Sequence, residues 1–153
     1  MYFIQQKIML SKASKHAVRG VLYLQYFASK DLKISAKQVA EELEIPAPFL
    51  SKILQKLTKK RIISSIKGPF GGFYLSKADE KNTLLDIIAC VDGIDKFNDC
   101  FLGQLECNEE NPCVVHHLYA PFKNELLKKL KNKTILELAK EYAINNNLSK
   151  KIE

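Results

Sequence analysis

The stretch from Ser35 to Leu75 constrains the fold most, because it predicts two short helices and a tight hairpin in immediate succession. Ser35-Ala-Lys-Gln38 has the form of a capping box, so a helix should begin there and end near Glu44. Ile45-Pro46-Ala47-Pro48 then interrupts it, since proline disfavours helical geometry in the preceding residue but is tolerated in the first turn of a new helix. The new helix should bury five apolar residues: Phe49, Leu50, Ile53, Leu54 and Leu57.

A glycine-rich segment follows this second helix. Residues 62–67 have the composition of a strand, Gly68-Pro69-Phe70-Gly71-Gly72 predicts a turn, and residues 73–75 form a returning strand. Apolar residues at three-to-four spacing over residues 14–28 predict a further helix upstream. A helical hairpin alone has many uses, but one followed by a β-hairpin is typical of a winged helix-turn-helix, whose second helix enters the major groove of DNA.

This interpretation names the residues that would face DNA. The outer side of the second helix is small, polar and basic, and the hairpin glycines would allow the backbone to approach a phosphate. Lys67 and Gly68, where the first strand meets the turn, would lie along the DNA backbone or the minor groove. The candidate DNA-binding residues are Pro48, Phe49, Ser51, Lys52, Gln55, Lys56, Lys67 and Gly68.

Charge is divided unevenly along the chain. The formal net charge is +7, from 24 lysines and arginines against 17 acidic residues. Residues 45–78 carry seven basic residues and no acid, whereas residues 79–122 carry nine acids and two bases. An uninterrupted basic run predicts a polyanion-binding surface, although a solvated lysine-rich face has the same composition. The helix-turn-helix and hairpin patterns favour the polyanion.

Length and hydropathy predict a chain that folds in the cytoplasm. The 153 residues can bury a core without disulfide or metal staples. The longest uncharged stretch, residues 111–122, is shorter than the roughly 18 apolar residues of a membrane span. The first eight residues lack the apolar length of a signal peptide. Cysteines in such a protein should be reduced and not paired as disulfides.

The four cysteines fall into two groups. Cys90 lies in an apolar helical segment and is expected in the core. Cys100, Cys107 and Cys113 lie in a loop-like stretch followed by His116, in the pattern C-x6-C-x5-C-x2-H. Three thiolates and an imidazole suit tetrahedral zinc or an iron–sulfur cluster, and clustered thiols also suit a metal-free redox sensor. Gaps of five and six are loose for a compact zinc site, and spacing alone does not choose among the three.

In this order the features resemble the iron–sulfur cluster regulator (IscR/NsrR-type) family of bacterial winged helix-turn-helix transcriptional regulators. The most specific match is Lys67-Gly68-Pro69-Phe70-Gly71-Gly72-Phe73-Tyr74-Leu75, which is similar to the family's basic-Gly-Pro-x-Gly-Gly-Tyr-x-Leu element. Val91-Asp92-Gly93 resembles the family's valine–aspartate step, after which the three cysteines and His116 fall in register. The similarity also covers Met9-Leu10-Ser11-Lys12, Ala17-Val18-Arg19 and residues 45–57.

The resemblance implies a cofactor. Family members hold a 2Fe–2S or 4Fe–4S cluster on three cysteines, here Cys100, Cys107 and Cys113, and His116 stands at the place of a histidine ligand. We expect 2Fe–2S rather than 4Fe–4S, with zinc as the alternative. The chain departs from the best-known cluster regulators in its first gap, which holds six residues where they have five. Some members use an acidic ligand from the partner's first helix, but Lys15 stands at that position.

The resemblance also implies a homodimer built on one long C-terminal helix that starts near Pro121. Members typically begin where Met9 stands, so residues 1–8 are expected to be an N-terminal extension. The apolar residues assigned to the dimer helix are Leu126, Leu127, Leu130, Ile135, Leu138 and Ala139.

The sequence therefore predicts a mainly α fold with a small β-hairpin wing. Residues 1–78 would form the winged helix-turn-helix domain, and residues 79–153 the sensor loop and dimerisation helix. The predicted function is a dimeric transcriptional regulator that binds a pseudo-palindromic site on double-stranded DNA and senses redox, iron–sulfur or nitric oxide status. The alternative is a winged-helix regulator with structural zinc or a metal-free thiol switch.

Two other classes fit less well. An enzyme is not expected, because the chain has neither a nucleophile elbow nor a phosphate-binding glycine loop. An iron–sulfur carrier without DNA binding would explain the cysteines, but not the helix-turn-helix, the wing or the acid-free stretch.

Overall fold

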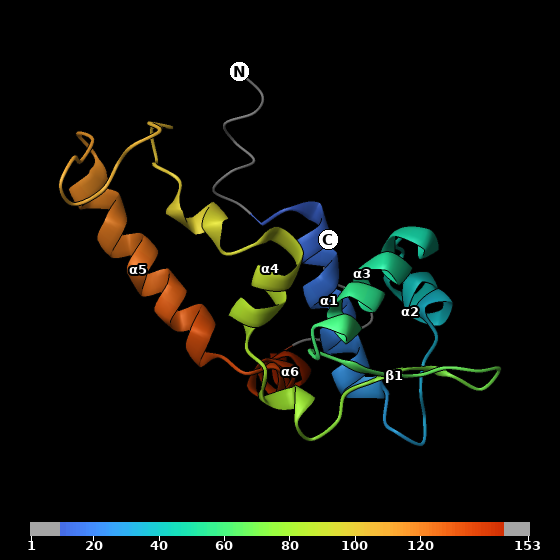
Figure 1. Ribbon diagram of the computed structural model, residues 1–153. Coiled ribbons are helices and arrows are strands. Elements are labelled where there is room, and N and C mark those ends of the chain that lie inside the picture. Colours follow the sequence, from blue (N-terminus) through green and yellow to red (C-terminus); the bar gives the residue numbers. More distant parts are fainter. Residues whose placement is uncertain (1–9, 146–153) are drawn as a thin grey trace.

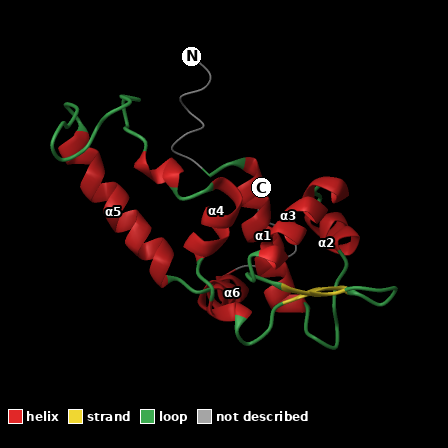
Figure 2. Ribbon diagram, viewed as in Figure 1, coloured by secondary structure: helices red, strands yellow, loops and turns green. Residues whose placement is uncertain are grey.

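We analysed a computed structural model of the chain, which describes residues 10–145. The expected extension, residues 1–8, lies outside this range. The fold is mainly helical with one two-stranded hairpin, as predicted (Figures 1 and 2). The elements are α1 (Lys12–Phe27), α2 (Ala36–Leu43), α3 (Ala47–Lys59), β1 (Ser64–Ile66), β2 (Gly72–Tyr74), η1 (Asp79–Lys81), α4 (Leu84–Asp92), η2 (Asp95–Asn98), α5 (His116–Asn132) and α6 (Ile135–Asn145).

The helix-turn-helix forms as its capping residues dictate. The Ser35 side chain accepts from the backbone amide of Gln38, and the Gln38 side chain closes the capping box on Ser35. Glu44 ends α2 in the left-handed conformation, at a φ of 55°. Pro46 caps α3, where a missing amide proton costs no hydrogen bond.

The core is where α1 and α3 cross, and most of the predicted apolar residues lie in it. Leu24, Leu50, Leu54 and Leu57 are fully buried. Phe49 differs from the prediction, since 38% of it is exposed and its ring contacts the edge of His16. Phe49 lies in the first turn of α3, at the edge of the core, beside His16 of α1.

Two glycines set the geometry of the hairpin. Ser65 pairs with Phe73 in the antiparallel register, and Phe73 also bridges to Ile34 on its other side. A Cβ on Gly71 would lie 2.1 Å from the carbonyl oxygen of Ile66, and one on Gly72 would lie 2.8 Å from that of Ile34. Both glycines are therefore required by close backbone packing within the protein, independently of any phosphate.

The C-terminal region corrects the expectation of one long helix from Pro121 through Ala139. Helix α5 already begins at His116, and the chain breaks at Lys133 and Thr134 before α6 starts. Thr134 caps α6 in a reciprocal pair with Glu137. The break is also held by backbone hydrogen bonds from Leu84 to the carbonyl of Lys133, at 3.0 Å, and from Ile135 to that of Asn82, at 2.8 Å.

After the break, α6 turns back onto α1 and completes the core. Ile135 is fully buried and Ala139 is buried, so neither is available to a partner as the dimer-helix expectation required. Ile135 and Ile87 of α4 belong to the same hydrophobic cluster as α1 and α3. The winged helix and the last helix therefore share one core.

The remaining helix, α5, projects from this body. In Figure 1 it stands beside α4, with the cysteine-containing loop at its far end and the hairpin at the opposite side of the molecule. Within residues 10–145, none of the helices combines the length and the apolar character that a membrane span requires.

The shared core predicts cooperative unfolding. Ile135→Ala should lower the free energy of unfolding by about 2–5 kcal/mol, because it leaves a cavity against α1. Lys140→Ala, on the exposed side of the same helix, should change it by less than about 0.5 kcal/mol. Urea denaturation followed by circular dichroism and by tyrosine fluorescence at one protein concentration should give coincident transitions. Two separated transitions would contradict a single core.

Candidate metal centre and nucleic-acid interface

The loop between α4 and α5 brings the three predicted cysteine ligands together. The Sγ atoms of Cys100, Cys107 and Cys113 all lie within 4.8 Å of one another. Cys100 Sγ and Cys113 Sγ are 3.6 Å apart. Cys113 is buried, and the backbone amide of Cys113 donates to Cys107 Sγ at 3.4 Å. This amide stabilises negative charge on the sulfur, as a ligating thiolate requires.

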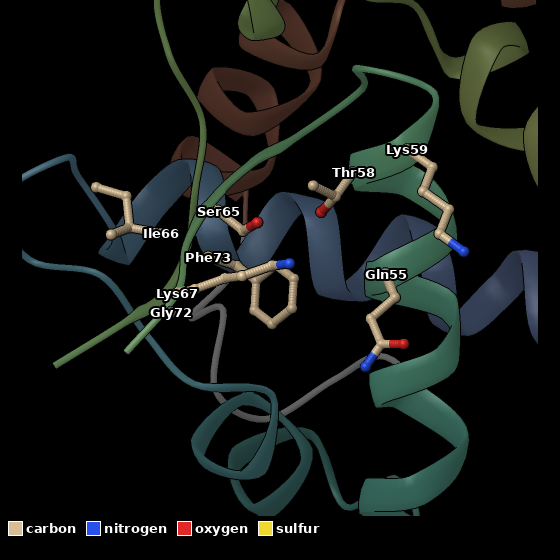
Figure 3. Close-up of a pocket in the computed structure, with 8 residues that line it drawn as sticks. All are labelled: Gln55, Thr58, Lys59, Ser65, Ile66, Lys67, Gly72 and Phe73. Carbon is tan, nitrogen blue, oxygen red and sulfur yellow. The ribbon is translucent and has the colours of Figure 1, made fainter. Parts of the chain in front are cut away.

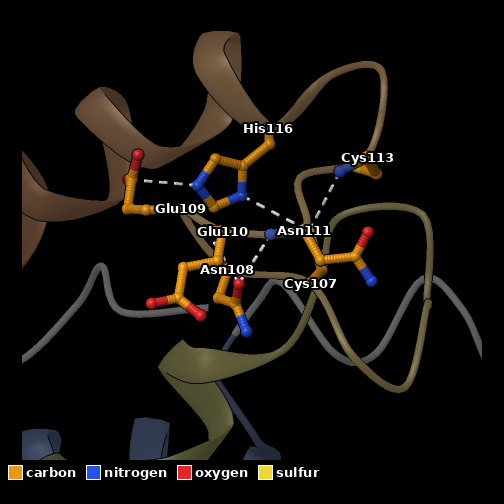
Figure 4. A network of polar contacts seen from close by, with 7 residues as sticks. All are labelled: Cys107, Asn108, Glu109, Glu110, Asn111, Cys113 and His116. Atoms are coloured by element: carbon orange, nitrogen blue, oxygen red, sulfur yellow. Dashed lines mark hydrogen bonds and ion pairs between the residues drawn. The ribbon is translucent and has the colours of Figure 1, made fainter.

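His116 joins this cluster from the first turn of α5. Its Nδ1 lies 3.3 Å from Cys107 Sγ, and its side chain is only 12% exposed. On the other side of the ring, Nε2 lies 3.1 Å from Oε1 of Glu109 (Figure 4). The structure thus gathers all four predicted ligands in one place.

The thiols are tuned in opposite directions. Burial acts to raise the pKa of Cys100, but hydrogen bonds from the Gln104 and Leu102 backbones outweigh it and lower that pKa to about 7. For Cys107 the Cys113 amide acts to lower the pKa, but burial and the neighbouring Cys100 outweigh it and raise the pKa above its ordinary value. One thiol that loses its proton readily beside another that keeps its own is the behaviour of coupled groups.

The fourth cysteine is separate. Cys90 is half-buried in α4, packs against the core and lies with its Sγ 3.8 Å from the carbonyl oxygen of Lys56 in α3. Burial raises the pKa of its thiol. These surroundings agree with the predicted core role and not with a ligand role.

The Val91-Asp92 step, just before the cysteine loop, is hydrogen-bonded to α3 and to the residue that caps α1. Val91 accepts a hydrogen bond from the Lys56 ammonium at 3.4 Å. Asp92 accepts from the backbone amide of Ser11, at 3.2 Å, and from the Ser11 hydroxyl. Since Ser11 caps α1 and Lys56 lies on α3, this step joins the start of the loop to α1 and α3.

The eight predicted DNA-facing residues are exposed, except Ser51, which is half-buried. Lys52, Gln55 and Lys56 are exposed on α3, Ser51 is half-buried, and Gln55 donates to the Ser51 hydroxyl at 3.3 Å. Pro48 and Phe49 lie at the start of the helix. Lys67 and Gly68 are exposed beyond β1, and Gly68 has a φ of 116° with open space around it.

A cleft of about 500 Å³ separates α3 from the hairpin. Figure 3 shows Gln55, Thr58 and Lys59 on the helix across from Lys67 and Phe73 on the hairpin. Of the residues that line this cleft, Gln55 and Lys67 are among the candidate DNA-binding residues, whereas Thr58, Lys59 and Phe73 are not. Lys59 lies four residues after Gln55, on the same face of the helix.

Glu109 was also missed in the cysteine loop. It is one of three glutamates near Cys107, with Glu106 and Glu110, and the sequence offers no signal that separates it from them. Its proximity to His116 depends on the turn that the loop makes.

Comparison with known proteins identifies the family. Residues 10–141 match the model of the Rrf2 family, described as "Iron-dependent Transcriptional regulator". A protein from Aquifex aeolicus that is named as an HTH-type transcriptional regulator is 33% identical over 133 residues. These residues are 86% of this chain and 91% of that protein. The HTH-type transcriptional regulator IscR of Yersinia pseudotuberculosis is 26% identical over 84% of this chain and 77% of its own length.

Solved structures agree on the fold. CymR, the global cysteine regulator of B. subtilis, superposes with a TM-score of 0.70 at 19% identity, over 88% of this chain and 98% of its own. T. potens IscR superposes with a TM-score of 0.67 at 20% identity, over 91% of this chain and 92% of its own. The match to the Rrf2 model and to the curated regulators confirms the resemblance drawn from the sequence, and with it the expectation of a transcriptional regulator and not an enzyme. The chain belongs to the Rrf2 family of transcriptional regulators.

Proposed function

We propose that this chain is a dimeric, sequence-specific DNA-binding regulator that senses redox, iron–sulfur or nitric oxide status through an iron–sulfur cluster on Cys100, Cys107, Cys113 and His116. One observation carries the proposal. Three thiols from one loop and the imidazole of His116 from the start of α5 meet at one place. The residue step just before this loop is hydrogen-bonded to the recognition helix α3 through Val91.

The four donors can be divided into two pairs, which is the number that a 2Fe–2S cluster requires. Cys100 Sγ and Cys113 Sγ are 3.6 Å apart, and Cys107 Sγ and His116 Nδ1 are 3.3 Å apart. Two ligands on one tetrahedral metal at about 2.3 Å lie roughly 3.8 Å apart. A binuclear cluster needs two such pairs, one for each iron. When bound, the cluster would supply one-electron redox chemistry, and the chain's own residues would hold it.

A second candidate is a regulator with structural zinc on the same residues. This candidate is supported by the short distances among the three sulfurs, which all lie within 4.8 Å of one another. A single tetrahedral ion needs all its ligands this close, whereas a binuclear cluster divides them between two metals. The same short separations also suit the metal-free thiol switch, in which two of these thiols form a disulfide.

The loop would act on DNA through the Val91-Asp92 step before it and not by contact. Residues 79–122 carry nine acids against two bases, and thiolate ligands add negative charge, so phosphates repel this segment. Binding of a metal or cluster at the cysteines would order the loop. The hydrogen bonds of Val91 and Asp92 would then transmit this conformational change to α3 and α1.

Dimer formation would use the exposed apolar side of α5. Leu118, Phe122 and Leu126 are 79%, 62% and 37% exposed and follow one another at four-residue spacing. Residues at this spacing lie on one face of a helix. A second copy, related by two-fold symmetry and packed on this face, would bury the apolar residues of both copies. The two recognition helices would then be positioned to bind the two halves of a pseudo-palindromic operator.

DNA affinity should depend strongly on salt. If the dimer neutralises about eight phosphates, the logarithm of affinity should fall with the logarithm of salt at a slope of about −7. Lys67→Ala should reduce that slope by about 2, one phosphate for each protomer. Lys77→Ala is the matched control, because Lys77 pairs with Glu80 at 3.4 Å. Fluorescence anisotropy with DNA selected from a random pool measures both, and a flat salt dependence would contradict the interface.

Protein purified without oxygen should be coloured and contain iron and sulfide. Cys107→Ala should remove the colour and change the affinity for DNA, because it takes one of the four ligands. Cys90→Ala should keep the colour, since Cys90 lies in α4 and outside the cluster. Colourless protein with one zinc per chain would favour the second candidate. Metal-free protein whose free thiols decrease on treatment with oxidant and reappear on reduction would favour the thiol switch.

Phe122→Glu should convert the dimer to a monomer and weaken operator binding more than tenfold, because it places a charge in the centre of the apolar face. Asn124→Glu is the control, since residue 124 lies about half a turn around α5 from the stripe. Sedimentation velocity measures the oligomeric state. A Phe122→Glu protein that stays dimeric would show that the two copies meet elsewhere.

A further inference from the structure

His116 is held from both sides, and the residue on its outer side has no role in the function proposed above. Nδ1 faces Cys107 Sγ at 3.3 Å, and Nε2 faces Oε1 of Glu109 at 3.1 Å. The imidazole is only 12% exposed, whereas the Glu109 side chain is 79% exposed. Figure 4 shows the ring lying between the carboxylate and the sulfur.

A tight turn brings Glu109 to this place. The Asn108 side chain accepts hydrogen bonds from the backbone amides of Glu110, at 2.9 Å, and Asn111, at 2.8 Å. The Asn108 amide in turn donates to the Asn111 carbonyl at 3.3 Å. The asparagine therefore closes the turn with its own side chain, as this residue type often does. Within the described part of the chain, Nε2 of His116 pairs with Glu109 and not with the next residue, Glu110.

The pairing decides which ring nitrogen is free. A carboxylate accepts hydrogen bonds, so the contact with Glu109 favours the tautomer that carries its proton on Nε2. A neutral imidazole has one proton, and Nδ1 is then left with a lone pair that points at Cys107. In metal sites, a carboxylate on the far nitrogen fixes the tautomer and the orientation of a ligating histidine and makes it more basic.

We propose that Glu109 is a positioning residue, which holds His116 with Nδ1 toward the three thiols so that the histidine is ready to act as the fourth ligand. This inference rests on the proposed metal-sensing function and names a residue outside the set of four ligands. Without the carboxylate, nothing holds the proton on Nε2, and a proton on Nδ1 would occupy the lone pair that the metal needs.

Metal-free protein tests the inference directly. Nitrogen-15 NMR of histidine-labelled full-length protein should show His116 protonated on Nε2. In Glu109→Ala the fraction protonated on Nδ1 should rise, while Glu110→Ala, a change in the same turn, should match the wild type. A merely structural role for Glu109 would leave the tautomer unchanged. Wild-type protein with its His116 proton on Nδ1 would overturn the inference.

Cobalt titration under anaerobic conditions gives the second measurement. Glu109→Ala should bind Co²⁺ about 10–100-fold more weakly than the wild type and Glu110→Ala, a range typical of lost carboxylate partners of metal-bound histidine. Equal affinities in all three proteins would overturn the inference. Wild-type protein that takes up neither Co²⁺ nor a cluster would contradict the proposed function, and the NMR result would still decide what Glu109 does to the ring.

Discussion

The arrangement depends on the turn at Lys133 and Thr134, where α5, which runs from the cysteine loop toward the body, ends and α6 begins. Backbone hydrogen bonds to Asn82 and Leu84 hold the turn, and Thr134 starts a new helix there. Because α6 folds onto α1, Ile135 fills the core. Because α5 stands to one side of this core, its apolar side stays exposed and the cysteine loop lies far from the hairpin. The break between the two helices thus separates a helix that completes the core from one whose exposed side is available for assembly.

The sequence predicted the elements whose causes are local. The capping box at Ser35, the proline entry to α3 and the turn at residues 68–72 each involve neighbours in the chain, and each was located correctly. The break before α6 was missed because apolar residues continue through it at helical spacing. Its cause is the strand-like bridge between Thr83 and Thr134, which are far apart in the sequence.

The candidate site divides in the same way. Cysteine and histidine are scarce and chemically distinctive, so Cys100, Cys107, Cys113 and His116 could be selected from their types and order, and the structure brings them together. Glu109 could not be selected, because the loop holds several glutamates and only the Asn108 turn brings one of them to the ring. Lys56 shows a related limit, since the sequence placed it facing outward and its ammonium reaches back to Val91.

The two hairpin glycines limit how this protein can change. A side chain at Gly71 or Gly72 would meet main-chain atoms, which no rotamer change can relieve, so it would distort the turn of the hairpin or its pairing with Ile34. The side chains of Lys67 and Phe70 are exposed and meet no such restriction. Single substitutions can therefore alter the charge that the hairpin presents, while its backbone path stays fixed. Descendants of this chain can change the surface of the hairpin through side chains far more easily than through a new backbone shape.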